Sequence, residues 1–177
     1  MSRGQRDALL LGEWACLGIL AAGPAHGYDV AARLKPGGDI GRVWSLSRAL
    51  TYRARDQLTG RGYVEPVGVE PGLAGGERTI LAPTPAGRAQ LRRWLAEPVL
   101  HLRDLRSELV LKLVLCGVCQ VDTAPLVAAQ RAHAEDMAAA LEAQMATDPA
   151  DVVVLWRHEA AQAALRFLDH LPAAQGR

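Results

Sequence analysis

Hydroxyl and guanidinium side chains concentrate in one short stretch of the chain, between Val43 and Leu58. Arginine can donate hydrogen bonds to guanine edges and to phosphates, and serine and threonine can bind phosphates near a helix N-terminus. A helix that carries these groups near its start suits the major groove of DNA. The residues that we expect to contact nucleic acid are Ser45, Ser47, Arg48, Thr51, Tyr52 and Arg53.

The same stretch must also have a side that faces the protein. We expect Leu50, Ala54 and Leu58 to point inward, with the Tyr52 ring packed in the core and its hydroxyl turned toward a phosphate. The simpler interpretation of these polar residues is a solvent-exposed helix face that binds no partner. The concentration of Ser, Thr and Arg at one helix start favours DNA contact over it.

Cysteine and histidine give no convincing reactive site. Cys116 and Cys119 form a single C-x-x-C pair inside an apolar segment, whereas zinc would need two further ligands and no second pair exists. We therefore expect buried core thiols, and keep a cysteine-based redox sensor as an alternative. The histidines His101, His133, His158 and His170 have no nucleophile or carboxylate at a motif spacing, so no catalytic residue, metal or cofactor is expected.

Charge is distributed unevenly although the whole chain has a net charge of only +1. Residues 1–97 carry 13 Lys/Arg and 9 Asp/Glu, while residues 98–177 carry 7 and 10. This asymmetry suggests that only the N-terminal part meets a polyanion. The start of the chain does not resemble a signal peptide, no apolar run could span a bilayer, and the three cysteines give no disulfide framework. We expect a cytoplasmic protein.

Apolar periodicity and breaker residues predict a mainly α-helical fold with a small β-hairpin. Helices are expected at 7–22, at 27–35, in the Ser/Arg segment, and from Thr84-Pro85 to about Pro98, where Thr84 is a suitable N-cap. Residues 63–70 and 78–83 predict two strands joined by the Gly-rich loop 71–77. This order predicts a winged helix-turn-helix domain at 1–97, with the hairpin as the wing. Arg78, at the base of the wing, is expected to contact DNA.

After residue 97 the sequence predicts helices and no further strands. Helices are expected over 107–120, from Asp122 to about Ala146, and after the break at Thr147-Asp148-Pro149. The last helix carries an apolar series at spacings of three and four, and a narrow seam of this kind buries little surface by itself. We therefore expect residues 98–177 to form a helical dimerisation domain. The series consists of Trp156, Ala160, Ala163, Phe167 and Leu171.

The ordered motifs of this chain resemble those of the PadR family of bacterial transcriptional regulators. They are His26-Gly27-Tyr28, Trp44-Ser45-Leu46-Ser47-Arg48 with Tyr52 and Leu58, Arg78-Thr79, Thr84-Pro85-Ala86-Gly87-Arg88, and Trp94-Leu95. The resemblance covers residues 8–97. Arg55 and Leu81 depart from it, since the family usually has a buried aliphatic residue at the first position and often an aromatic one at the second.

This resemblance implies a homodimer that binds an inverted repeat in double-stranded DNA, usually as a repressor, and often releases it when a small molecule binds. It implies dimer contacts through the C-terminal helices and the first helix. It also places Trp14 and Trp94 near the dimer axis, where they are candidates for effector binding beside the simpler role of core residues. The alternative from a different class is a winged-helix protein-interaction module without DNA binding.

Overall fold

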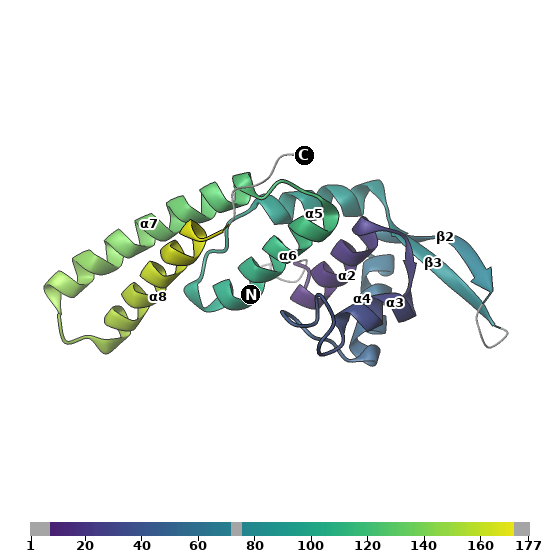
Figure 1. Cartoon of the computed structure of the whole chain (residues 1–177), viewed down its shortest axis with the longest axis horizontal. Coiled ribbons are helices and arrows are strands. Elements are labelled where there is room, and N and C mark those ends of the chain that lie inside the picture. The colour runs from purple at the N-terminus through teal and green to yellow at the C-terminus, as the bar shows by residue number, and fades with distance from the viewer. Residues whose placement is uncertain (1–7, 72–75, 172–177) are drawn as a thin grey trace. The chain divides into compact units, whose positions relative to one another are not determined.

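A computed structural model describes residues 8–71 and 76–171 of the chain (Figure 1). By their contacts, the described residues form two compact units. The first runs to Leu95 and also includes 111–121, and the second comprises 96–110 together with the residues from Asp122 onward. Within the described residues, no helix is both long and apolar enough to cross a bilayer.

Three helices open the first unit: α2 (Leu11–Ala22), α3 (Gly27–Leu34) and α4 (Arg48–Gly60). The order agrees with the sequence prediction, but α2 begins four residues later than expected. Leu10 has extended backbone, and its N–H donates to the Glu13 carboxylate at 2.8 Å, so this side chain caps the helix at its observed start. The expected start at Asp7 lies outside the described residues.

A small antiparallel sheet follows, with strand order β1-β3-β2. The wing strands β2 (Val64–Pro71) and β3 (Glu77–Pro83) confirm the predicted hairpin, and residues 72–75 of its loop lie outside the described residues. The two-residue strand β1 (Ala25–His26), which was not predicted, pairs with β3. The register of β2 shifts between Pro66 and Gly68, because proline has no N–H to donate to a ladder.

Helix α5 (Pro85–Ala96) is capped as the sequence predicted. The Thr84 hydroxyl accepts a hydrogen bond from the Gly87 N–H at 3.1 Å and donates one to the Gly62 carbonyl at 2.7 Å. A Cβ atom at Gly87 would lie 2.1 Å from the Tyr63 carbonyl oxygen. Only glycine therefore allows this close approach between the wing and α5.

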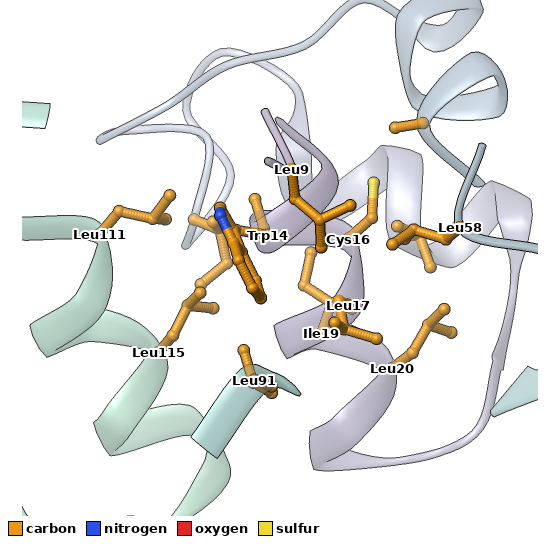
Figure 2. Close-up of a cluster of buried hydrophobic side chains, with 14 of the residues drawn as sticks. Leu9, Trp14, Cys16, Leu17, Ile19, Leu20, Leu58, Leu91, Leu111 and Leu115 are labelled. Carbon is orange, nitrogen blue, oxygen red and sulfur yellow. The ribbon is translucent and has the colours of Figure 1, made fainter. Parts of the chain in front are cut away.

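Helix α6 (Val110–Cys119) packs into the core of the first unit, although the sequence placed it with the residues after 97. Figure 2 shows Leu111 and Leu115 beside Trp14 of α2, with Leu91 of α5 nearby. The helices approach so closely that Leu115 occupies the space of a Cβ at Gly18, and the Cys119 thiol donates to the Gly18 carbonyl at 3.3 Å. The first unit thus includes a segment from beyond the predicted boundary.

The second unit contains two long helices, α7 (Ala124–Thr147) and α8 (Val152–Asp169), which lie side by side (Figure 1). Ala138, Leu141 and Ala161 form their common core. Asp151, which follows the predicted break at Thr147-Asp148-Pro149, caps α8, because its carboxylate accepts the N–H groups of the first helical turn. Before α6 lie a 3₁₀ turn, η1 (Leu102–Asp104), and a π turn, η2 (Leu105–Leu109), in place of the start of the expected regular helix.

Candidate nucleic-acid interface

The Ser/Arg segment divides into an irregular approach, which begins with a turn at 43–44, and a helix. Residues 43–46 precede α4, and Ser47 caps it by accepting the Leu50 N–H at 3.3 Å. The Thr51 hydroxyl donates to the Ser47 carbonyl at 3.1 Å, and the residue is 1% exposed. Thr51 is therefore occupied inside the protein, which removes it from the exposed surface that the sequence indicated.

The inward face of α4 differs from the prediction at one of three residues. Thr51, Ala54 and Leu58 are buried, whereas Leu50 is 49% exposed. The prediction that Leu50 points inward was wrong. Because Ser47 fixes the start of α4, spacings of three and four from Thr51 define the buried stripe and leave Leu50 outside it.

An exposed cluster of arginine and tyrosine joins α3 to α4. The Arg48 guanidinium carbon lies 5.8 Å from the centre of the Tyr28 ring and 5.6 Å from that of the Tyr52 ring. A guanidinium over an aromatic face is attracted by the ring quadrupole, which restricts its motion while its N–H groups stay available. Tyr28 is 58% exposed and was not among the predicted contact residues. Its position in the His-Gly-Tyr motif is the signal that could have identified it.

Arg55 does not extend into solvent as a free cation. Its Nε and one terminal nitrogen donate to the Asp56 carboxylate at 2.9 and 2.6 Å, and its guanidinium carbon lies 4.7 Å from the Tyr52 ring centre. The departure from the family pattern at this position thus leaves a surface ion pair beside Tyr52. Ser45, Ser47 and Arg53 are exposed. The described surface around α4 therefore carries Tyr28, Ser45, Ser47, Arg48, Tyr52 and Arg53.

The wing differs from α4 in its charge. Its strands carry three exposed carboxylates, Glu65, Glu70 and Glu77, and the described wing residues include only one cation, the half-buried Arg78. The His26 ring lies between the carboxylates of Asp29 and Glu70. Through these contacts His26 connects α3 to strand β2.

Trp14 and Trp94, the candidate effector residues, stack on each other in the core of the first unit. Their ring centres are 4.5 Å apart with planes inclined by 5°, and the residues are 6% and 8% exposed. The buried Lys112 ammonium lies 4.8 Å from the Trp94 ring centre. A ligand that enters between the two rings must therefore first separate them.

Cys16 and Cys119 lie in surroundings that favour the neutral thiol. Burial raises the pKa of Cys16 to about 12, with a smaller contribution from Glu13, and burial also raises the pKa of Cys119. A raised pKa lowers the thiolate fraction and with it the reactivity of the thiol. Within the described part of the chain, no group of three His, Cys, Asp or Glu side chains is arranged to hold a metal ion.

The helix order, the paired wing strands and the exposed α4 define a winged helix fold, which confirms the predicted fold class. No family model matches the sequence, and no curated protein matches it. Among solved structures, the chain is similar to Bacillus subtilis PadR in complex with operator DNA, with 18% identity, a TM-score of 0.47, and coverage of 89% of this chain and 95% of that chain. It is also similar to the same protein in complex with p-coumaric acid, with 17% identity, a TM-score of 0.45 and coverage of 90% and 95%. PadR is the family that the sequence motifs resemble.

Proposed function

We propose that this protein is a homodimeric DNA-binding transcriptional regulator that places α4 in the major groove. The observation that carries the proposal is the exposed position of Arg48 between Tyr28 and Tyr52 at the start of α4. A restrained guanidinium loses less freedom when it binds a guanine edge or a phosphate. Ser45, Ser47 and Arg53 lie around it as additional donors.

The charges of the wing indicate that α4 contributes more to binding than the wing does. Three exposed carboxylates on β2 and β3 repel phosphates, and Arg78 offsets only one of them. We therefore expect Arg78 to contact DNA but to contribute less to binding than the residues of α4. The repressor role and its release by a small molecule are what the resemblance to the PadR family implies, and p-coumaric acid is bound by B. subtilis PadR.

The exposed apolar residues of α8 support the homodimer. Val152, Trp156 and Phe167 are 74%, 73% and 41% exposed, and none of them belongs to the buried residues of the helix, which are Ala161, Ala164 and Leu168. A soluble chain rarely leaves such a surface uncovered. A second copy that presents the same helix would cover it with two-fold symmetry.

Fluorescence anisotropy with DNA from the upstream region of the gene and with scrambled DNA tests the proposal. We expect tight binding that resists competitor DNA and weakens steeply with salt. Arg48→Ala should weaken specific binding at least ~tenfold, which corresponds to the loss of one good base or phosphate contact. Arg78→Ala should have a smaller effect, and Arg92→Ala, which alters an exposed arginine on α5, should have almost none.

Two alternatives give different results in the same assay. A protein-interaction module predicts no binding to any DNA at low salt and no effect of Arg48→Ala. A redox sensor predicts that oxidant weakens DNA binding and that replacing Cys116 and Cys119 by serine abolishes this sensitivity. The raised pKa of Cys119 disfavours the redox sensor.

A further inference from the structure

His26 ends the short strand β1, and each of its two ring nitrogens has a carboxylate beside it. The buried Nδ1 atom faces Asp29 of α3, and the Nε2 atom lies 3.4 Å from the Glu70 carboxylate on β2. The two acidic side chains are half exposed, whereas the His26 side chain is only 20% exposed. The ring therefore links the wing to the helices of the first unit through two acidic groups.

The charge of the His26 ring decides how many of these contacts are favourable. A neutral imidazole carries a proton on one nitrogen only, so its other nitrogen turns a lone pair toward a carboxylate. The imidazolium donates from both nitrogens and attracts both carboxylates. Histidine is the side chain that ordinarily changes charge between pH 5 and 8. We therefore expect the contact with Glu70 to be strong in mildly acidic solution and to weaken as the pH rises.

Glu70 has a second cation within reach, because the register of the wing places it directly opposite Arg78 of β3. Side chains at paired positions of an antiparallel ladder lie on the same face, with their Cβ atoms about 5 Å apart. Arg78 is the wing residue that the sequence indicated as a DNA contact, and it is the one cation of the described wing. A carboxylate that pairs with this guanidinium competes with phosphate for the same donors. The partner that holds Glu70 thus determines whether Arg78 is available to DNA.

Helix α4 also brings a charged group near His26. The side chains of Tyr52 and Arg55 lie beside the glycine that follows the histidine. Arg55 is already paired with Asp56, so its charge is largely balanced. From β3, the residue opposite His26 in the ladder is the apolar Ile80. The two carboxylates described above are therefore the groups that respond to the charge of the ring.

We propose that His26 is a positioning residue that makes the wing available to DNA when its ring is protonated. The imidazolium holds Glu70, which leaves the Arg78 guanidinium free to bind a phosphate. When the ring loses its proton, Glu70 pairs with Arg78 instead, and the wing presents its carboxylates without a free cation. This inference rests on the proposed DNA-binding function and adds a pH dependence to it. The affinity for DNA is highest while the ring is protonated and falls as the pH rises through its titration.

Fluorescence anisotropy of the full-length protein with the upstream DNA, at pH 6 and at pH 8 and at constant salt, tests this inference. We expect the wild type to bind at least ~threefold more tightly at pH 6, which is the size of effect expected from one surface charge contact in each wing. His26→Gln should bind at both pH values as weakly as the wild type does at pH 8, because Glu70 stays with Arg78. Glu70→Gln should bind at both pH values as tightly as the wild type does at pH 6, because Arg78 is always free.

The charge-matched control is Glu65→Gln, which removes another exposed carboxylate of β2, one whose register partner is the apolar Ala82. The control should strengthen binding by the same factor at both pH values and keep the pH difference of the wild type. Thermal unfolding shows which variants are folded, and Glu70→Gln, at an exposed position, tests the same contact if His26→Gln is not. The inference is overturned if His26→Gln or Glu70→Gln keeps the pH difference, or if Glu65→Gln loses it.

An NMR titration of the protein without DNA separates this inference from the proposed function. The backbone amide signals of Glu70 and Arg78 should shift in one step as the His26 ring titrates, and His26→Gln should lack this step. If the protein binds no DNA but shows the step, the proposed function fails, while the charge-dependent contact between His26 and Glu70 stands. If the protein binds DNA equally well at both pH values, this inference fails and the proposed function stands.

Discussion

Helices α2 and α8 are both rich in apolar residues, but α2 is much more deeply buried than α8. Nine consecutive residues of α2, from Gly12 to Leu20, are buried on all sides of the helix. In α8 only Ala161, Ala164 and Leu168 are buried, and Trp156 is 73% exposed. The difference shows that α2 is the central core helix of its unit, while α8 has one face for α7 and a second face that a single chain does not use.

The largest expected effect comes from removing part of the covered helix. Leu17→Ala should destabilise the protein by roughly 2–5 kcal/mol, because Leu17 is completely buried and the surrounding side chains cannot collapse fully into the space. Urea unfolding followed by circular dichroism measures this loss. Val67→Ala, at a 53% exposed position on β2, is the matched control, and a similar loss in both variants would contradict the role of α2 as the core.

Substitutions on the exposed face of α8 should affect the association between chains rather than the stability of one chain. V152A/F167A changes little inside one chain, since both side chains are largely exposed. It should weaken association of the protein at least ~tenfold, because two apolar contacts are lost from the interface. Sedimentation velocity over a concentration series measures this, with R166Q as an exposed control on the same helix. Unchanged association would mean that α8 is not the dimer surface.

Helix α4 differs from both α2 and α8, because its exposed face is polar. Ser47→Ala should cost about 1 kcal/mol of stability, because the Leu50 N–H loses its acceptor. Ser47→Asp should retain the cap but place a negative charge at the expected DNA surface. Thermal unfolding and DNA anisotropy together separate the two roles. If the aspartate variant binds DNA as tightly as the wild type, Ser47 acts only as a cap.

The smallest expected effect concerns a surface ion pair. The Arg33 guanidinium holds the pKa of Asp39 below its usual value through hydrogen bonds of 3.0, 3.1 and 2.6 Å, and the pair joins α3 to the segment before α4. Because the folded state lowers this pKa, its stabilisation is present above pH 3.8 and is lost as the pH falls below it.

Asp39→Asn should therefore lower the free energy of unfolding by at most about 1 kcal/mol at neutral pH, and by much less under acidic conditions. Urea unfolding at pH 6 and at pH 3 tests this expectation. Asp136→Asn, on the exposed side of α7, is the control. A loss that is equal at both pH values would show that the charge of Asp39 is not responsible.

The parts of the fold that depend on local signals could be predicted from the sequence. The order of the helices, the wing strands and the cap at Thr84 follow from periodicity, β-branched residues and capping chemistry. On the inward face of α4, Ala54 and Leu58 were predicted correctly, but Thr51 takes the place expected for Leu50, because the helix begins after Ser47. The short strand β1 was missed because two residues carry no periodicity.

Contacts between distant segments could not be predicted in this way. Nothing in the apolar pattern of 110–119 shows that it packs against α2, since any apolar surface could cover it. Likewise, Tyr28 meets Arg48 only because α3 and α4 pack together. The exposure of Ser45, Ser47, Arg48 and Arg53 could therefore be expected from the sequence, whereas the contact of Arg48 with Tyr28 could not.

The inclusion of α6 in the first unit has a consequence for synthesis on the ribosome. The chain leaves the first unit after Leu95 and returns at Leu111, so the core around Trp14 and Leu17 lacks one wall until residue 121 has been made. We expect the nascent winged helix domain to remain incompletely folded up to that point and to close its core only when α6 emerges from the exit tunnel. A chain that stops at residue 97 should expose this core and aggregate.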